Sequence, residues 1–284
     1  MNEAGSVSNQ VAFYVACWLF CTSGVAGARD YPLWEAGAGV GFLSIPDYRG
    51  AEEQREYALP IPYLIYRGER LRVDREKVRG LLLETQRWEL NISAGAGVPV
   101  NSNDNAARKG MPDLHPTVEL GPQINITLAG SRDSAYQLDL RLPVRQVWAV
   151  DWPGLRSVGR VFSPVLNYDL RNRWLGPRLR LGLQAGPIFA DGDYHRYYYQ
   201  VDPAFSRADR PAYSAGGGYA GSQGTISLSQ RFDGYWVGAF VRVSDLHGAV
   251  IEDSPLVRQK TNLFGGVAVS RVFGRSAKRV EAEE

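Results

Sequence analysis

The chain has 284 residues, a formal net charge of +2 and 22% charged residues. Because bundles of transmembrane helices are much more apolar than this, the composition argues against that class. Basic residues are interspersed with acidic ones and no basic run occurs, so we expect no nucleic-acid partner.

Residues 1–28 are predicted to be an export signal peptide. They contain a short apolar stretch, and Ala26 and Ala28 then form the small-x-small pattern that a signal peptidase cleaves. The segment departs from the usual pattern because no Lys or Arg precedes the apolar stretch. Both cysteines, Cys17 and Cys21, fall inside it, so residues 29–284 contain no thiol.

Apolar and polar residues alternate strictly in several later segments. In Arg87–Val98 the even positions are apolar or small, from Trp88 to Val98, and the odd positions are polar residues or glycine. The same pattern recurs over 117–128, 136–148 and 175–189. A period of two places alternate side chains on opposite faces of a strand, as in a barrel strand with one face in lipid and one in a polar lumen.

A soluble β-sandwich also alternates, but its strands are usually about 5 to 6 residues long. The alternating segments here approach or exceed the roughly 9 to 11 residues that an oblique membrane strand needs. We therefore predict an all-β fold, an antiparallel transmembrane β-barrel of about 12 strands (range roughly 10–14), in residues 29–273. The expected strands lie near 33–44, 57–66, 69–74, 79–85, 87–98, 116–129, 134–149, 156–170, 174–190, 218–232, 234–247 and 261–273.

The alternation also assigns side chains to the two faces. Aromatic residues at strand ends suit the two lipid headgroup levels, and the expected girdle consists of Trp88, Tyr136, Trp148 and Phe189. The residues expected to line the lumen, where they form ion pairs across a narrow interior, are Glu35, Glu89, Glu119, Asp139, Arg141, Arg145, Arg178, Arg180 and Arg242. The loops 99–115 and 191–217 are predicted to lie at the outer end, the second folding over the mouth or binding a ligand.

No motif predicts catalysis, a cofactor or a metal. The glycine-rich run at 37–41 lies in an alternating strand and lacks a third spaced glycine. His115, His195 and His247 lie far apart without ligand spacing. Ser214 gives only half of the hydrolase pattern Gly-x-Ser-x-Gly. We expect a non-enzyme with no cofactor.

Several short segments, in their order and spacing, resemble the MipA/OmpV family. They are Ile45–Gly50, Pro60–Tyr63 with Tyr66–Gly68, Gly110–Leu114 and Glu119–Pro122. The resemblance implies a barrel in the bacterial outer membrane, embedded in its lipid. It further implies a scaffold that bridges a lytic transglycosylase, which is a murein hydrolase, and a penicillin-binding protein in peptidoglycan synthesis. No catalytic residue is implied.

Two alternatives remain open at this stage. One is a small outer-membrane channel or solute-binding barrel, and the other is a membrane-embedded hydrolase. Phe273 is expected to close the last strand, and the charged tail 274–284 is expected to be disordered.

Overall fold

The computed structural model describes residues 30–68, 71–73, 78–80, 83–85, 87–131, 134–171 and 178–281. The predicted signal peptide, with Ala26, Ala28 and both cysteines, lies outside the described residues. The long strands are β2 (Trp34–Pro46), β3 (Gln54–Arg67), β7 (Trp88–Gly97), β8 (Thr117–Gly130), β9 (Tyr136–Asp151), β10 (Gly154–Phe162), β11 (Val165–Leu170), β12 (Leu179–Ala190), β13 (Gly218–Arg231), β14 (Tyr235–Asp245) and β15 (Thr261–Arg275). The shorter elements are β1 (Asp30–Pro32), β4 (Leu71–Val73), β5 (Val78–Gly80), β6 (Leu83–Glu84), β16 (Arg279–Glu281), the helix α1 (Gly192–Tyr199) and two 3-10 turns at Ser102–Asp104 and Pro203–Phe205.

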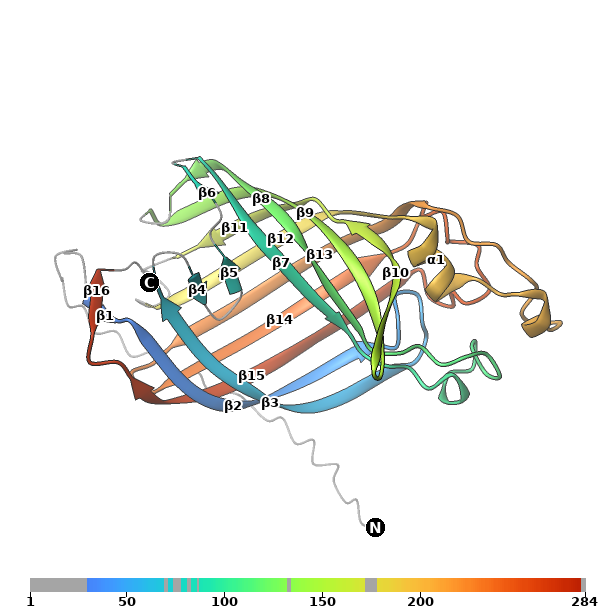
Figure 1. The fold of residues 1–284 in the computed structure, drawn as a ribbon, viewed down its shortest axis with the longest axis horizontal. Coiled ribbons are helices and arrows are strands. Elements are labelled where there is room, and N and C mark those ends of the chain that lie inside the picture. The colour runs from blue at the N-terminus through green and yellow to red at the C-terminus, as the bar shows by residue number, and fades with distance from the viewer. Residues whose placement is uncertain are drawn as a thin grey trace, which may run out of the picture.

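All the strands except β1 and β16 form one antiparallel sheet that curls into a barrel (Figure 1). Strands adjacent in sequence pair as hairpins, and the last long strand, β15, pairs with the first, β2. The sheet order begins at β5 and ends at β6, and β5 lies beside β7, so the cylinder is completed through these short strands. The predicted antiparallel barrel is confirmed.

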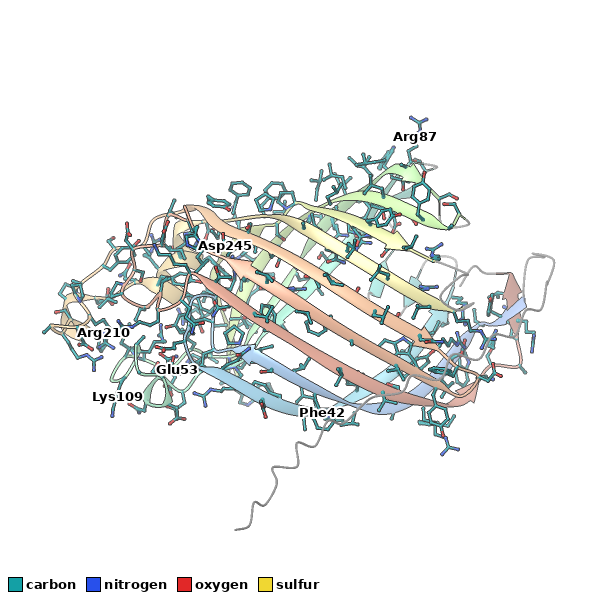
Figure 2. The ribbon with its side chains drawn as sticks, turned by 180° about the vertical axis from the view of Figure 1, so that it is seen from behind. Phe42, Glu53, Arg87, Lys109, Arg210 and Asp245 are labelled. Carbon is teal, nitrogen blue, oxygen red and sulfur yellow. The ribbon has the colours of Figure 1, made fainter. Side chains whose placement is uncertain are left out.

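The two faces of each strand differ in the way the alternation predicts. In β9, Tyr136 and Val144 are 42% and 46% exposed, whereas Asp139 and Arg141, which have the opposite parity, are only 6% and 8% exposed. Phe42 likewise points outward at mid-barrel in Figure 2. An apolar outer face and a polar inner face match a membrane-spanning barrel, in which charge on the lipid side is costly.

The structure differs from the expected elements in three places. The segments near 69–74 and 79–85 carry only short strands in their described residues. The strand expected at 156–170 is divided at Ser163 and Pro164 into β10 and β11, and proline cannot donate to the ladder there. The tail is not wholly disordered, because β15 continues to Arg275 and β16 pairs with β1.

The two ends of the barrel carry different structures. Helix α1 lies with the long loops at one end, and β1 and β16 lie at the other (Figure 1). Short turns such as 232–234 connect strands at the end that holds β1 and β16. Within the described ranges, no helix is long and apolar enough to cross a membrane.

Candidate functional site

Four loops at one end of the barrel form a compact structure that we call the loop cap: residues 47–53, 98–116, 191–217 and 246–260. Each loop contributes buried apolar side chains to a common core. Leu246, Ile251 and Leu256 have no exposed surface. Because a shared core fixes loops that are far apart in sequence, the cap is a folded unit over the mouth of the barrel.

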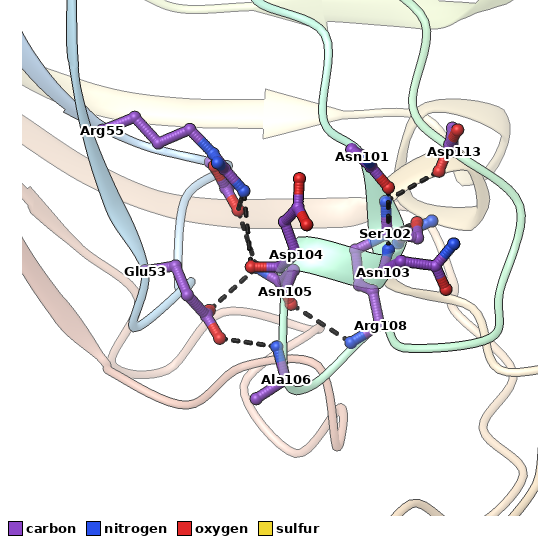
Figure 3. A network of polar contacts seen from close by, with 11 residues as sticks. Glu53, Arg55, Asn101, Ser102, Asn103, Asp104, Asn105, Ala106, Arg108 and Asp113 are labelled. Carbon is purple, nitrogen blue, oxygen red and sulfur yellow. Dashed lines mark hydrogen bonds and ion pairs between the residues drawn. The ribbon is translucent and has the colours of Figure 1, made fainter.

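A polar network joins the first two loops of the cap (Figure 3). The side-chain amide of Asn105 donates to Asp47 at 2.9 Å and to Glu53 at 2.8 Å. The other oxygen of Glu53 accepts from the backbone N–H of Ala106 at 2.6 Å, and Arg55 forms an ion pair with Asp47 at 2.6 Å. Asn105 is fully buried, so its amide would be costly to leave without these acceptors.

The segment Gly110–Leu114 is held by backbone-directed contacts. Asp113 accepts from the N–H of Ser102 at 2.7 Å, and the Ser102 hydroxyl donates to the Pro112 carbonyl at 2.7 Å. Arg108 donates to the same carbonyl at 3.0 Å. Gly110 has a φ of +82°, which glycine adopts without strain. The positive φ and the contact to Ser102 account for the glycine and the aspartate of this segment.

Arg210 connects the second and third loops. It is 2% exposed and donates to the carbonyls of Ala107 at 2.9 Å, Lys109 at 3.1 Å and Phe205 at 2.6 Å. Backbone carbonyls thus satisfy its donors, which a buried guanidinium requires. Figure 2 places Lys109 and Arg210 together at the tip of the loop cap.

The aromatic helix α1 attaches the third loop of the cap to the first two loops. Asp191 caps its first turn by accepting from the N–H of Tyr194 at 3.0 Å. The hydroxyl of Tyr197 donates to the His115 carbonyl at 3.1 Å, and that of Tyr199 donates to the Arg49 carbonyl at 2.9 Å. Burial raises the pKa of Tyr199 to about 12, so its hydroxyl keeps its proton and remains a donor.

His195 lies fully buried in the same helix. Its Nδ1 is 2.6 Å from the Gly216 carbonyl, and a carbonyl can only accept, so Nδ1 carries the proton. Its Nε2 has no hydrogen-bond partner. Burial lowers the pKa of His195, which favours the neutral ring. Across the described ranges, no group of His, Cys, Asp and Glu is arranged to hold a metal ion.

Several of the charged residues expected in the lumen are buried or half-buried inside the barrel. Arg141 is within 3.8 Å of Asp139 and 3.3 Å of Asp169, and Arg145 is 3.2 Å from Glu119. Glu89 is 5% exposed and lies close to Asn91. Arg180 is half-buried in β12.

Two other charged groups lie at the end of the barrel opposite the cap. Arg178 is exposed and forms an ion pair with Asp233 at 2.6 Å, so it lies at the rim rather than within the lumen. Glu35 is fully buried and accepts from Arg67 at 2.8 Å and from Arg231. Arg67 and Arg231 are not among the residues expected in the lumen, although each has the inward parity of its strand.

The expected girdle residues occupy both ends of the strands. Trp88 and Tyr136 begin β7 and β9 and are 44% and 42% exposed. Phe189, near the cap end of β12, is 39% exposed, and Trp148 near the cap end of β9 is half-buried. Their positions fit two aromatic belts at the headgroup levels, a placement that stays a prediction.

Comparison with known protein families gives a match over most of the chain. Residues 38–273 match the family described as "MltA-interacting protein MipA". This range covers most of the barrel and the whole loop cap. No curated protein matches the chain.

Two solved structures resemble the chain only distantly. The COG4313 outer membrane channel from Pseudomonas putida F1 is 13% identical, with a TM-score of 0.44, over 89% of this chain and 100% of that one. The Ralstonia pickettii toluene transporter TbuX is 10% identical, with a TM-score of 0.27, over 87% of this chain and 71% of that one. These scores are too low to bear on function.

Proposed function

The chain belongs to the MipA family of MltA-interacting proteins, and from that premise we propose that it is a non-catalytic scaffold for murein-remodelling enzymes. A lytic transglycosylase and a penicillin-binding protein are the partners we propose. The family match over residues 38–273 carries this proposal, because it covers the barrel rather than one loop. The chain is an outer-membrane barrel protein, consistent with its apolar outer face and polar interior.

We assign the partner surface to the end of the barrel that holds β1 and β16. Murein lies in the periplasm, and barrels of this class have short turns on the periplasmic side. The turn 232–234 is short, and Ala277 and Lys278 are exposed beside it in the chain segment that returns to β1. The loop cap would then lie on the outer surface.

Site-specific photocrosslinking in growing cells tests this assignment. A photoreactive amino acid at Ala277 should capture murein enzymes, whereas the same amino acid at Ala204, an exposed alanine of the loop cap, should not. Captured proteins are identified by mass spectrometry. Absence of murein enzymes from the Ala277 adducts, or equal capture from Ala204, would contradict the scaffold proposal.

A solute-binding barrel is the second candidate, and one observation favours it. Part of the barrel interior beneath the cap is only half-buried and carries arginines that have no carboxylate partner among the described residues. Solute binding and scaffolding use different surfaces of the molecule, so one does not exclude the other.

A further inference from the structure

The barrel interior is filled unevenly. On the side formed by β7, β8, β9 and β11 the inward polar side chains are buried: Glu89, Asn91, Gln123, Gln137, Asp139, Arg141 and Asn167. On the opposite side, the inward side chains of β13, β14 and β15 are half-buried around Thr225, Arg242 and Phe264. The inward side chains around Thr225, Arg242 and Phe264 therefore remain partly accessible.

Arg242 lies on that side, and no negative partner is found for it in the part of the chain that the structure describes. Its Nε donates to the Thr225 hydroxyl at 2.8 Å, and its guanidinium lies 5.5 Å from the centre of the Phe264 ring. Both contacts are with neutral groups. Its charged neighbours are the guanidiniums of Arg145 and Arg49.

Arg49 also enters the interior, where its side chain contacts a hydroxyl and a carbonyl. Its Nε donates to the Ser244 hydroxyl at 2.7 Å, and its Nη2 approaches the Ser222 carbonyl at 3.4 Å. Among the described residues, no Asp or Glu lies within ion-pair distance of Arg49 or Arg242. Arg145 is neutralised by Glu119 at 3.2 Å.

Two uncompensated guanidiniums in a partly desolvated interior create a positive potential. Withdrawing such charges from water is costly unless a negative group approaches them. The serine and threonine hydroxyls that orient Arg49 and Arg242 leave Nη atoms of Arg242 free to bind an anion. A bound carboxylate can accept two hydrogen bonds from a guanidinium fork.

The wall next to Arg242 is apolar. In the β14–β15 ladder, Phe264 lies opposite Arg242. Phe240 lies opposite Gly266, two residues away along each strand. A methyl group added at Gly266 would lie 2.4 Å from the Leu43 side chain and 3.2 Å from Phe240, so these two side chains converge over the glycine. An inner wall of this kind suits an aromatic or aliphatic body rather than a fully hydrated ion.

We propose that the barrel interior beneath the loop cap binds a small amphipathic organic anion. Its carboxylate lies between Arg49 and Arg242, and its apolar body lies against Phe240 and Phe264. The site goes beyond the proposed scaffold role and does not depend on it.

Calorimetric titration of the folded full chain in lipid nanodiscs tests the site with three probes. They are 4-phenylbutyrate, its neutral amide 4-phenylbutanamide, and inorganic sulfate. We expect 4-phenylbutyrate to bind at least about tenfold more tightly than the amide, the difference expected for losing a charged hydrogen bond. Sulfate should bind more weakly than 4-phenylbutyrate because it cannot use the apolar wall.

Three arginine variants locate the bound anion. Arg242→Gln should weaken 4-phenylbutyrate binding about tenfold, and Arg242→Lys should weaken it less because the cation is retained. Arg180→Gln removes a different half-buried lumen arginine and should leave the affinity within about twofold. Heat-modifiable mobility on a gel verifies that each variant is folded.

Four outcomes would overturn the proposal: no measurable binding of 4-phenylbutyrate, equal affinity for the amide, sulfate binding as tightly as 4-phenylbutyrate, or equal losses in the Arg242→Gln and Arg180→Gln variants. The last would indicate a diffuse positive potential instead of a site. Arg49→Gln provides a second, independent variant, because Arg49 lies in the loop 47–53 whereas Arg242 lies in β14. This substitution should also weaken the binding of 4-phenylbutyrate.

Discussion

At the scale of single residues, Leu183 and Gln184 are neighbours near the middle of β12 that face different surroundings. Leu183 is 38% exposed on the outer face, next to Ile226 of β13. Gln184 has the opposite parity and is half-buried inside the barrel. The burial of a side chain alternates with position, so adjacent substitutions test the two faces separately.

We predict that Leu183→Arg lowers the free energy of unfolding by about 2 to 4 kcal/mol, the cost of an arginine facing mid-bilayer lipid. Gln184→Arg should cost less, because an inward arginine can find water or polar partners. Urea-induced unfolding in lipid vesicles measures both. Equal losses for the two variants would mean that the faces are wrongly assigned.

His195 is the residue through which pH should act on the loop cap. Its folded pKa is lowered, mainly by burial, with Arg49 lowering it further and Asp191 opposing. Protons therefore bind the unfolded cap more readily than the folded one, and stability falls as pH drops below the ordinary histidine pKa of about 6.5. The loss is complete once the pH is below the folded pKa.

Accordingly, the protection factors of the amides in residues 191–217, which are corrected for the intrinsic pH dependence of amide exchange, should fall between neutral pH and the acid side of the His195 transition. The His195→Gln variant, which cannot titrate, should lose most of this pH dependence. His247→Gln is the matched control, because His247 is exposed and contacts only the carboxylate of Asp245 among the described residues. An unchanged pH response in His195→Gln would exclude His195 as its source.

At the scale of elements, Gly159 determines how closely α1 approaches β10. Gly159 has a φ of +122°, and a Cβ there would lie 2.3 Å from the backbone nitrogen of Tyr194. The pairing of β10 with β9 also shifts register between Ser157 and Gly159. A side chain at this position would meet both a disfavoured backbone conformation and the helix.

Gly159→Ala should therefore cost more than about 1 kcal/mol and make the loop 191–217 easier to cut with protease. Gly154→Ala, in the same strand, is the control. Its added methyl group would meet only the Asp151 carbonyl at 3.4 Å, and its φ is not in the left-handed region. Equal protease resistance of the Gly159→Ala variant and the unmodified chain would refute a tight docking of α1.

The terminal strand pair, β1 with β16, lies outside the main barrel sheet. The pairing of β15 with β2 does not depend on it, since that ladder runs from Gly265 opposite Ser44 to Arg275 opposite Glu35. Deletion of residues 276–284 should thus leave the barrel folded, with unchanged heat-modifiable mobility. Deletion of 270–284, which removes part of β15, should abolish it. Loss of the folded band in the shorter deletion would show that β16 is needed for closure.

The sequence predicts these elements to different degrees. Strands such as Trp88–Gly97 and Tyr136–Asp151 are evident because a period of two is a local property of the chain. The β1–β16 pair has three residues in each strand, too few to display a period. The alternation predicts that Arg145 and Glu119 each face the lumen. The structure shows that these two residues form an ion pair with each other.

Contacts between distant segments could not be predicted. Arg210 binds the Ala107 carbonyl, and Glu35 binds Arg231, across separations of 103 and 196 residues. Their positions depend on how the four loops and the strands of the barrel come together, and no local sequence pattern encodes that arrangement. The sequence accordingly predicts only that the loop 191–217 folds over the mouth of the barrel or binds a ligand, and not that four loops share a core.

At the scale of the whole molecule, the two ends of the barrel differ in structure. The loop cap closes one end with its own apolar core, and the strand ends with β1 and β16 form the other (Figure 1). The proposed scaffold role requires the second end to face the periplasm, where murein and its enzymes lie. The scaffold proposal therefore depends on the orientation of the barrel in the membrane.

Cysteine labelling in cells measures this orientation directly. Residues 29–284 contain no cysteine, so Ala204→Cys in the loop cap and Ala277→Cys near β16 each introduce a single thiol there. A membrane-impermeant maleimide should label Cys at 204 in intact cells, and should label Cys at 277 only after the outer membrane is permeabilised. Labelling at 277 in intact cells, with 204 protected until permeabilisation, would contradict the account.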